Sequence, residues 1–256
     1  MNSGGRFYVY SGGTTIGTSI SGSEYVYSGA ALATTVLKGG DYLYSGGTAS
    51  GTLIEGGSEF VSGGTTTNAT VFTGAREQIF TGGTAIGTVV SAGNMYVYSG
   101  GLASNTLIIG GFEFVYSGGT INGTTVDPHE KITVSVGGTV LGGIVLSGGS
   151  AVISGTVAAG QAIVFVNSGG DLLLNNTPAF QAVISGFGIG DKVDLTSFAF
   201  LSGTTDNYVE AASNTSGTLT VADGGNQVQL NFIGYYGTAE FQLGNDSNGG
   251  TAVKFV

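Results

Sequence analysis

Four acidic side chains recur at one position of a repeated sequence and are the first candidates for chemistry. Glu24, Asp41, Glu77 and Glu113 each stand five residues before a glycine that recurs along the chain. Two carboxylates held close together can bind calcium or serve as the acid and base of a glycan hydrolase. Solvated carboxylates that discourage aggregation at strand edges are the alternative, and the one we expect. We therefore predict no cofactor, and keep Glu24 and Asp41, on adjacent repeats, as the calcium candidates.

Other signals of catalysis are weak. His129 is the single histidine and the chain has no cysteine, which excludes a zinc cluster with histidine ligands and any thiolate site. A Ser-His-Asp site would have to use this histidine beside Pro128, where an irregular corner is the simpler interpretation. The sequence therefore predicts that the protein is not an enzyme.

Tyrosines follow the same spacing as the glycines. Nine of the twelve stand two or four residues before a recurring glycine: Tyr8, Tyr10, Tyr25, Tyr27, Tyr42, Tyr44, Tyr96, Tyr98 and Tyr116. Other repeats carry Glu59, Val61, Gln78, Phe80 and Phe114 at these positions. Two stripes of rings on one outer face indicate a contact surface, because large exposed apolar patches usually mark interaction sites. Stabilisation of neighbouring strands by ring stacking is the alternative, and both can hold together.

Serines directly precede most of these glycines. The row consists of Ser11, Ser28, Ser45, Ser62, Ser99 and Ser117. Small turn residues that hydrogen-bond to their own corner are the simpler interpretation. A regular array of hydroxyl acceptors for a modifying enzyme is the alternative.

These spacings belong to a repeat that governs the first two thirds of the chain. Variants of Tyr8-Val9-Tyr10-Ser11-Gly12-Gly13-Thr14 recur around Gly12, Gly29, Gly46, Gly63, Gly82, Gly100, Gly118 and Gly137, in steps of 17 to 19 residues. A second corner follows each of these glycines. A period near 18 with β-branched strands and glycine corners predicts an all-β fold, a single-stranded β-solenoid or parallel β-helix. Each coil should hold two strands and two corners.

Strand alternation predicts which side chains face inward. Three residues before the first corner stand Val9, Val26, Leu43, Phe60, Ile79, Val97, Val115 and Val134. Two before the second corner stand Ile20, Leu37, Ile54, Phe72, Val90, Ile108, Val126 and Leu146. We expect both columns to form the core. A ladder of Thr18, Thr35, Thr52, Thr70, Thr88, Thr106 and Thr124 has the same parity and should chain its hydroxyls from coil to coil.

Charge and composition exclude several partners. The 256 residues carry a formal net charge of -10 and only six Lys or Arg. No basic stripe is available to neutralise phosphates, so nucleic acid and anionic membrane surfaces are poor partners. No run of eighteen apolar residues occurs, and we expect no membrane insertion by a helix.

The repeat weakens after Gly148 and ends near Pro178. The segment 179–256 holds seven of the sixteen acidic residues, and 219–230 indicates a hairpin. We predict a β-solenoid domain over 1–175 and a β-rich C-terminal module over 176–256. The second would cap the open end of the solenoid, whose backbone would otherwise stay unpaired.

The tandem Tyr-Val-Tyr-Ser-Gly-Gly-Thr units, with Gly-Thr-x-x-x-Gly-Gly corners between them, resemble the repeats of bacterial AIDA-type adhesins, which are autotransporter passengers. The likeness covers residues 1–150. It implies a surface-exposed β-solenoid that mediates adherence and self-association and is glycosylated on serines. By position, the acceptors would be the six serines named above, and a glycosyltransferase would be a partner.

The C-terminal part departs from that family. Residues 183–195 and 250–256 resemble instead the C-terminal modules of large type I secreted bacterial proteins, which carry an uncleaved export signal. Together the two likenesses imply a secreted protein or one on the bacterial cell surface.

The sequence thus favours an extracellular adhesin or surface scaffold. Its partners would be cell-surface glycans or copies of itself, held by many weak contacts to the repeated tyrosines. Two alternatives stay open: an enzyme that acts on polysaccharides, and a passive spacer or secretion module of a larger protein.

Overall fold

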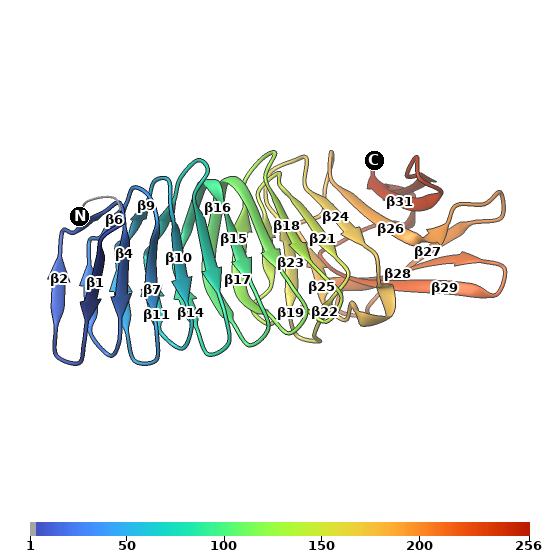
Figure 1. Cartoon of the computed structure of the whole chain (residues 1–256). Coiled ribbons are helices and arrows are strands. Elements are labelled where there is room, and N and C mark those ends of the chain that lie inside the picture. Colours follow the sequence, from blue (N-terminus) through green and yellow to red (C-terminus); the bar gives the residue numbers. More distant parts are fainter. Residues whose placement is uncertain (1–3) are drawn as a thin grey trace.

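The computed structural model describes residues 4–256, and residues 1–3 of the predicted repeat domain lie outside this part. Strands dominate the described chain, with two short 3-10 turns, η1 (Thr177–Ala179) and η2 (Thr238–Glu240). The chain winds into a rod of stacked coils, and the first coil lies at one end of the rod (Figure 1). This architecture is the predicted parallel β-solenoid.

Most coils contribute short strands to three parallel faces. The first face consists of β1 (Arg6–Val9), β4 (Ser23–Val26), β7 (Gly40–Leu43), β10 (Ser58–Val61), β13 (Arg76–Ile79), the ends of β15 (Val89–Val97) and β16 (Leu102–Val115), β18 (Lys131–Val134), β21 (Ser150–Ile153), β24 (Asp171–Leu174) and β26 (Lys192–Ala199). We number the coils 1 to 11 by these strands.

The second and third faces follow in each coil. The second holds β2 (Thr14–Ile16), β5 (Ala30–Leu32), β8 (Thr48–Ser50), β11 (Thr65–Thr67), β14 (Thr84–Ile86), the starts of β16 and β17 (Thr120–Val126), β19 (Thr139–Val140) and β22 (Thr156–Val157). The third holds β3 (Ser19–Ile20), β6 (Thr35–Val36), β9 (Leu53–Ile54), β12 (Thr70–Val71), parts of β15, β16 and β17, β20 (Ile144–Leu146), β23 (Ala162–Phe165) and β25 (Val183–Ser185).

The coil therefore has three strands, where the sequence predicted two. A third corner lies between the second and third faces, and its central residue has positive φ. These residues are Gly17, Ala33, Gly51, Asn68, Gly87, Asn105, Gly123 and Gly143. Glycine and asparagine tolerate this left-handed backbone best, and the threonine that follows in most coils turns the chain into the third face.

Single-residue differences in corner length correct three predicted core positions. Val61, not Phe60, pairs with Leu43 inside the first face, because coil 4 has one residue fewer at its first corner. On the third face Val36 and Val71 are buried in place of Leu37 and Phe72. The other predicted core residues of both columns are buried.

Parallel pairing continues beyond residue 175. β24 pairs in parallel with β26, and β25 pairs with the end of β29 (Asn226–Ile233). Strand direction changes after β26, where β27 (Thr205–Glu210), β28 (Ser216–Asp223) and β29 form an antiparallel ribbon that projects from the end of the rod (Figure 1). β30 (Phe241–Asn245) and β31 (Gly250–Phe255) pair antiparallel with each other, and β31 covers the last edge of the first face along β26. The division at 175/176 into two domains stays a prediction.

Candidate functional site

The predicted tyrosines line the outside of the first face in two columns. Ring column A follows one register position: Tyr8, Tyr25, Tyr42, Phe60, Gln78, Tyr96 and Phe114. Adjacent ring centroids in this column are 4.6 to 5.5 Å apart. Gln78 interrupts the stack in coil 5.

Ring column B lies two residues further along each coil. It contains Tyr10, Tyr27, Tyr44, Ser62, Phe80, Tyr98 and Tyr116. From coil 2 onward, the backbone amide of each of these residues donates to the backbone carbonyl of a core residue in the preceding coil. Its stacked centroids are 4.7 to 5.7 Å apart. Ser62 interrupts this column in coil 4. We call both columns together the ring face.

The rings stack on one another, so the surface they offer is one of edges and hydroxyls. Neighbouring planes within each column differ by 5 to 17°. The ring of Tyr10 is 63% exposed at the first coil, while rings in the middle of each column are half-buried by their neighbours. Burial and adjacent phenols raise the pKa of Tyr27, Tyr42 and Tyr98, which therefore stay protonated hydrogen-bond donors at neutral pH.

The six predicted serines do not form one equivalent row. Ser11, Ser45, Ser99 and Ser117 are exposed and directly precede a glycine with positive φ. Ser28 is also exposed, but it has positive φ itself, and its hydroxyl donates to the carbonyl of Ser45 at 3.0 Å. Ser62 is half-buried and occupies a ring position of column B.

The acidic residues lie inside the rod, which corrects the expectation of solvated carboxylates. Glu24, Asp41, Glu59, Glu77 and Glu113 are all 0% exposed. They share one inward register position of the first face, where Met95 stands between Glu77 and Glu113. The signal was present in the sequence: Glu24 stands two residues before the core residue Val26 and therefore shares its parity. The shorter corner of coil 4 hid Glu59 from this column.

Threonines face the carboxyls across the interior. Thr15 and Thr34 donate to Glu24 at 2.8 and 3.4 Å. Thr106 and Thr124 donate to the two oxygens of Glu113 at 3.3 and 2.9 Å, and Thr88 donates to Glu77 at 3.2 Å. We call the five carboxyls together with Thr15, Thr34, Thr52, Thr66, Thr88, Thr106 and Thr124 the polar seam.

The predicted threonine ladder is thus partly corrected. Thr52, Thr88, Thr106 and Thr124 are buried as expected, whereas Thr35 and Thr70 are only half-buried and the inward places belong to Thr34 and Ala69. At Glu24, Glu77 and Glu113 the threonine hydroxyls donate to the carboxyl and not to the next threonine. The acidic column explains this, because a carboxyl is the better acceptor.

Burial dominates the electrostatics of the seam. It raises the pKa of Glu59 and of Glu113 to about 7, against the lowering effect of the threonine hydroxyls. Burial and neighbouring carboxylates hold the pKa of Asp41 and Glu77 well above the ordinary range. Burial also raises the pKa of Glu24. Within residues 4–256, no group of three or more Asp, Glu, His or Cys side chains is arranged to hold a metal ion.

His129 lies in an exposed corner between the third and first faces, with a φ of 70°. Next to it the Glu130 carboxylate accepts a hydrogen bond from the Gly111 amide at 2.6 Å, and the Lys131 ammonium lies 5.7 Å from the centre of the Phe112 ring. These contacts tie the corner to the preceding coil.

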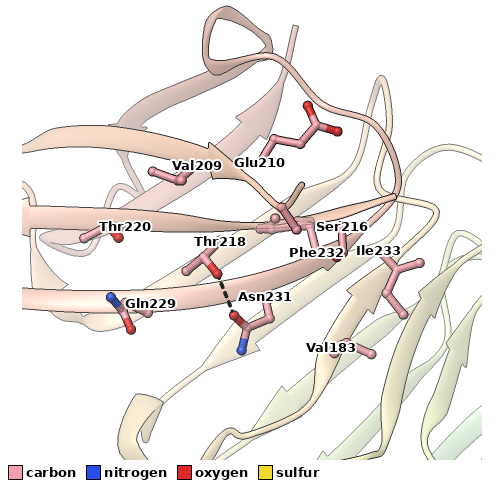
Figure 2. Close-up of a pocket in the computed structure, with 12 residues that line it drawn as sticks. Val183, Val209, Glu210, Ser216, Thr218, Thr220, Gln229, Asn231, Phe232 and Ile233 are labelled. Carbon is pink, nitrogen blue, oxygen red and sulfur yellow. Dashed lines mark hydrogen bonds between the residues drawn. The ribbon is translucent and has the colours of Figure 1, made fainter. Parts of the chain in front are cut away.

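The largest depression that we find lies on the C-terminal ribbon, away from the ring face. It has a volume of about 550 Å³. Figure 2 shows its lining from β25, β27, β28 and β29: Val183, Val209, Glu210, Ser216, Thr218, Thr220, Gln229, Asn231, Phe232 and Ile233. The Thr218 hydroxyl donates to the Asn231 side-chain oxygen at 3.0 Å, so these polar groups satisfy each other across the strands. Glu210 is the only ionisable residue of this lining.

Within the described part of the chain, no helix is long and apolar enough to cross a membrane.

Comparisons with known proteins give likenesses to solved structures only. No protein-family model matches the sequence, and no curated protein matches it significantly. Seven chains of solved structures match. Among them is the crystal structure of a TibC-catalysed, hyper-glycosylated fragment of TibA, residues 55–350 of that protein. The two are 29% identical with a TM-score of 0.48, over 73% of this chain and 76% of the fragment.

Proposed function

We propose that this protein is an extracellular bacterial adhesin or surface scaffold that acts by multivalent contacts through its ring face. The ring face carries the proposal, because two aligned columns of aromatic side chains cover the same outer face of seven successive coils. Packing inside one rod does not require rings on its outer surface. A repeated partner surface gives them a role.

The chemistry of the ring face favours hydroxyl-rich or aromatic partners. Because the flat faces of the rings lie against each other, a partner meets ring edges and phenol hydroxyls at about the strand spacing of 4.8 Å. Cell-surface glycans present hydroxyls that can pair with such a row. A second copy of the ring face presents the same edges and hydroxyls, which permits self-association.

Repetition makes weak contacts sufficient. Each coil offers nearly the same pair of groups, so a second contact forms at high effective concentration once the first is made. A polymeric glycan or another rod can therefore be held firmly although each single contact is weak. This arrangement suits a secreted or cell-surface location, where repeated ligands occur.

We also propose that a glycosyltransferase modifies serines at the first corner. Ser11, Ser45, Ser99 and Ser117 support this best, because they are exposed beside tight glycine turns. Ser28 is exposed too, whereas Ser62 is the weakest candidate because neighbouring coils cover it.

A binding role is favoured over catalysis on a polysaccharide. The carboxyls that could serve as acid and base, among them Glu24 and Asp41, are sealed inside the solenoid. A glycan cannot reach them unless the coils open.

Replacement of three rings tests the proposal. We expect the triple variant Tyr27→Ser, Tyr44→Ser and Tyr98→Ser to lose about tenfold or more in apparent affinity, because avidity multiplies the loss at each coil. The measurements are binding to a glycan panel and sedimentation of cells or beads coated with the protein. Circular dichroism checks that the solenoid persists.

Tyr235→Ser provides the matched control, because Tyr235 is 74% exposed and lies outside both ring columns. This variant should behave as the wild type. Unchanged adhesion and aggregation in the triple variant would favour a passive spacer, and shortened or unsaturated glycan products would favour an enzyme.

A further inference from the structure

The polar seam places five carboxyls inside a core where nothing positive reaches them. Glu24, Asp41, Glu59, Glu77 and Glu113 lie in coils 2, 3, 4, 5 and 7 at one register position. Each is fully buried. In coils 2 to 5 they follow one another directly, so neighbouring backbones are separated by only about 4.8 Å.

The groups that face the carboxyls are neutral on every side. The inward side chains of the second face are Thr15, Ala31, Ala49, Thr66, Ala85, Ala103 and Ile121, and those of the third corner include Thr34, Thr52, Thr88, Thr106 and Thr124. The titratable groups next to each carboxyl are the other carboxyls of the column. Arg76, on the same strand as Glu77, is exposed on the opposite side of the strand. Both ion pairs of the described residues belong to Lys192, in coil 11.

Hydrogen bonding is incomplete in the middle of the seam. Both carboxyl oxygens of Asp41 and of Glu59, one of Glu77, and the hydroxyls of Thr52 and Thr66 are buried without a hydrogen bond of good geometry. Thr52 and Thr66 lie close enough to Glu59 to lower its pKa, whereas the pKa of Asp41 is lowered only by the backbone amide of Tyr42. Two ionised carboxylates cannot bond to each other, whereas a protonated carboxyl donates to its neighbour. Glu59 and Glu77 are register partners on the adjacent strands β10 and β13, so a protonated Glu77 can donate to Glu59.

We propose that coils 2 to 7 fold with protons bound on the carboxyls of the polar seam, so that the solenoid takes up protons on folding and loosens as the pH rises above neutral. An isolated ionised carboxylate in a core without a counterion is strongly unfavourable, and adjacent like charges add to the cost. Protons remove both costs and supply the missing donors.

The direction of the pH dependence follows from linkage. The folded protein holds the pKa of Glu59 and of Glu113 at about 7, above their ordinary value of 4.5. A group with a raised pKa in the folded state contributes stability that is complete below its unfolded pKa and is lost as the pH rises through the folded pKa. The relevant window therefore runs from about pH 4.5 to above pH 7.

Removal of single seam carboxyls tests the proposal. The melting temperature of the wild type should fall by roughly 5–10 °C between pH 5 and pH 8.5. Glu59→Gln and Glu113→Gln keep the shape of the side chain but cannot ionise, so each should melt above the wild type at pH 8.5 and show a smaller fall. Glu55→Gln is the control, because Glu55 lies in the corner that leads into the strand of Glu59 and is exposed. It should reproduce the wild-type fall.

Two further measurements keep the proposal falsifiable if a variant does not fold. Proton titration of the native and unfolded wild type should show at least about two more protons bound to the native state at pH 6. Equal proton numbers would overturn the proposal. A rise in the wild-type melting temperature with calcium chloride at pH 8.5, absent in Glu59→Gln, would also overturn it, because a cation would then fill the place assigned to protons.

Discussion

Coils 1–7 and coils 8–11 share the first face of the rod, yet the side chains inside and outside that face change at one point, between coils 7 and 8. At the inward position of the first face Glu113 of coil 7 gives way to Ile132 of coil 8. At the third corner Thr124 gives way to Ile144. Outside, Phe114 gives way to Thr133, and column B ends with Tyr116. Polar seam and ring face therefore coincide along the rod.

The polar seam and the ring face coincide because side chains alternate along a strand, and the seam thereby helps to fix the strand register. Glu113 and Phe114 are neighbours in sequence and point to opposite sides of one strand. A slip by one residue would place the ring inside and the carboxyl outside, so seam and rings together fix the register. The coils from 8 onward lack such an acidic column, and there the steps lengthen from 19 to 21 residues, as Lys131, Ser150, Asp171 and Lys192 occupy equivalent positions.

A carboxyl introduced at the inward position of coil 8 should have the largest effect on the free energy of unfolding. Ile132→Glu places a carboxyl between Glu113 and Ala151 on the first face, where Ile144 replaces the threonine of the third corner, and should cost about 3–5 kcal/mol of unfolding free energy at pH 8. Met95→Glu fills the gap in the acidic column, where Thr106 already lies within 3.8 Å of the Met95 sulfur. It should cost only about 1 kcal/mol at pH 5. Urea unfolding at both pH values measures the difference.

Equal losses for the two substitutions would contradict the comparison, because the seam would then give a carboxyl no better surroundings than the apolar coils do. Ile132→Gln and Met95→Gln separate the effect of ionisation from that of polarity.

A smaller effect should follow from removal of one seam donor. Thr124→Val keeps the volume of the side chain but removes the hydrogen bond of 2.9 Å to Glu113. We expect a loss of about 1–2 kcal/mol in unfolding free energy and a still higher pKa of Glu113. Thr125→Val, at the adjacent half-buried position, should change the free energy by less. Chemical denaturation with both variants tests whether the donor matters.

The smallest effect should come from repair of the ring face. Ser62→Tyr inserts a ring between Tyr44 and Phe80 and makes column B continuous. We expect a gain of about 0.5–1.5 kcal/mol, together with tighter adhesion if the proposed function holds. Ser62→Ala serves as the control without a ring. A Tyr variant no more stable than the Ala variant would show that the columns do not act as stacks.

The solenoid could be predicted because its signal is repeated many times. The period near 18, the alternating apolar positions and the paired tyrosines each recur in most coils, so single exceptions did not obscure them. The alternation that places Val9 and Val26 inside also places Tyr8, Tyr10 and Tyr27 outside, where the structure has them. Their role as a binding surface stays a prediction.

The seam was missed because acidic residues are rarely buried without a partner, and the expectation for charge outweighed the parity of Glu24 and Asp41. The three-strand coil was missed because its third corner uses alanine or asparagine as well as glycine, as at Ala33 and Asn68. The polar seam and the third corner were missed for the same reason: the usual preference of a residue type was given more weight than the position of the residue in the repeat.

The corners carry a consequence for how such a rod can vary over generations. Five steps lead from Leu43 to Thr48 but four from Val61 to Thr65, although the strands on either side stay aligned. A corner can therefore lose one residue without a change in the strand register of the next coil. Unequal recombination between the gene segments for two coils would therefore give longer or shorter rods that still fold.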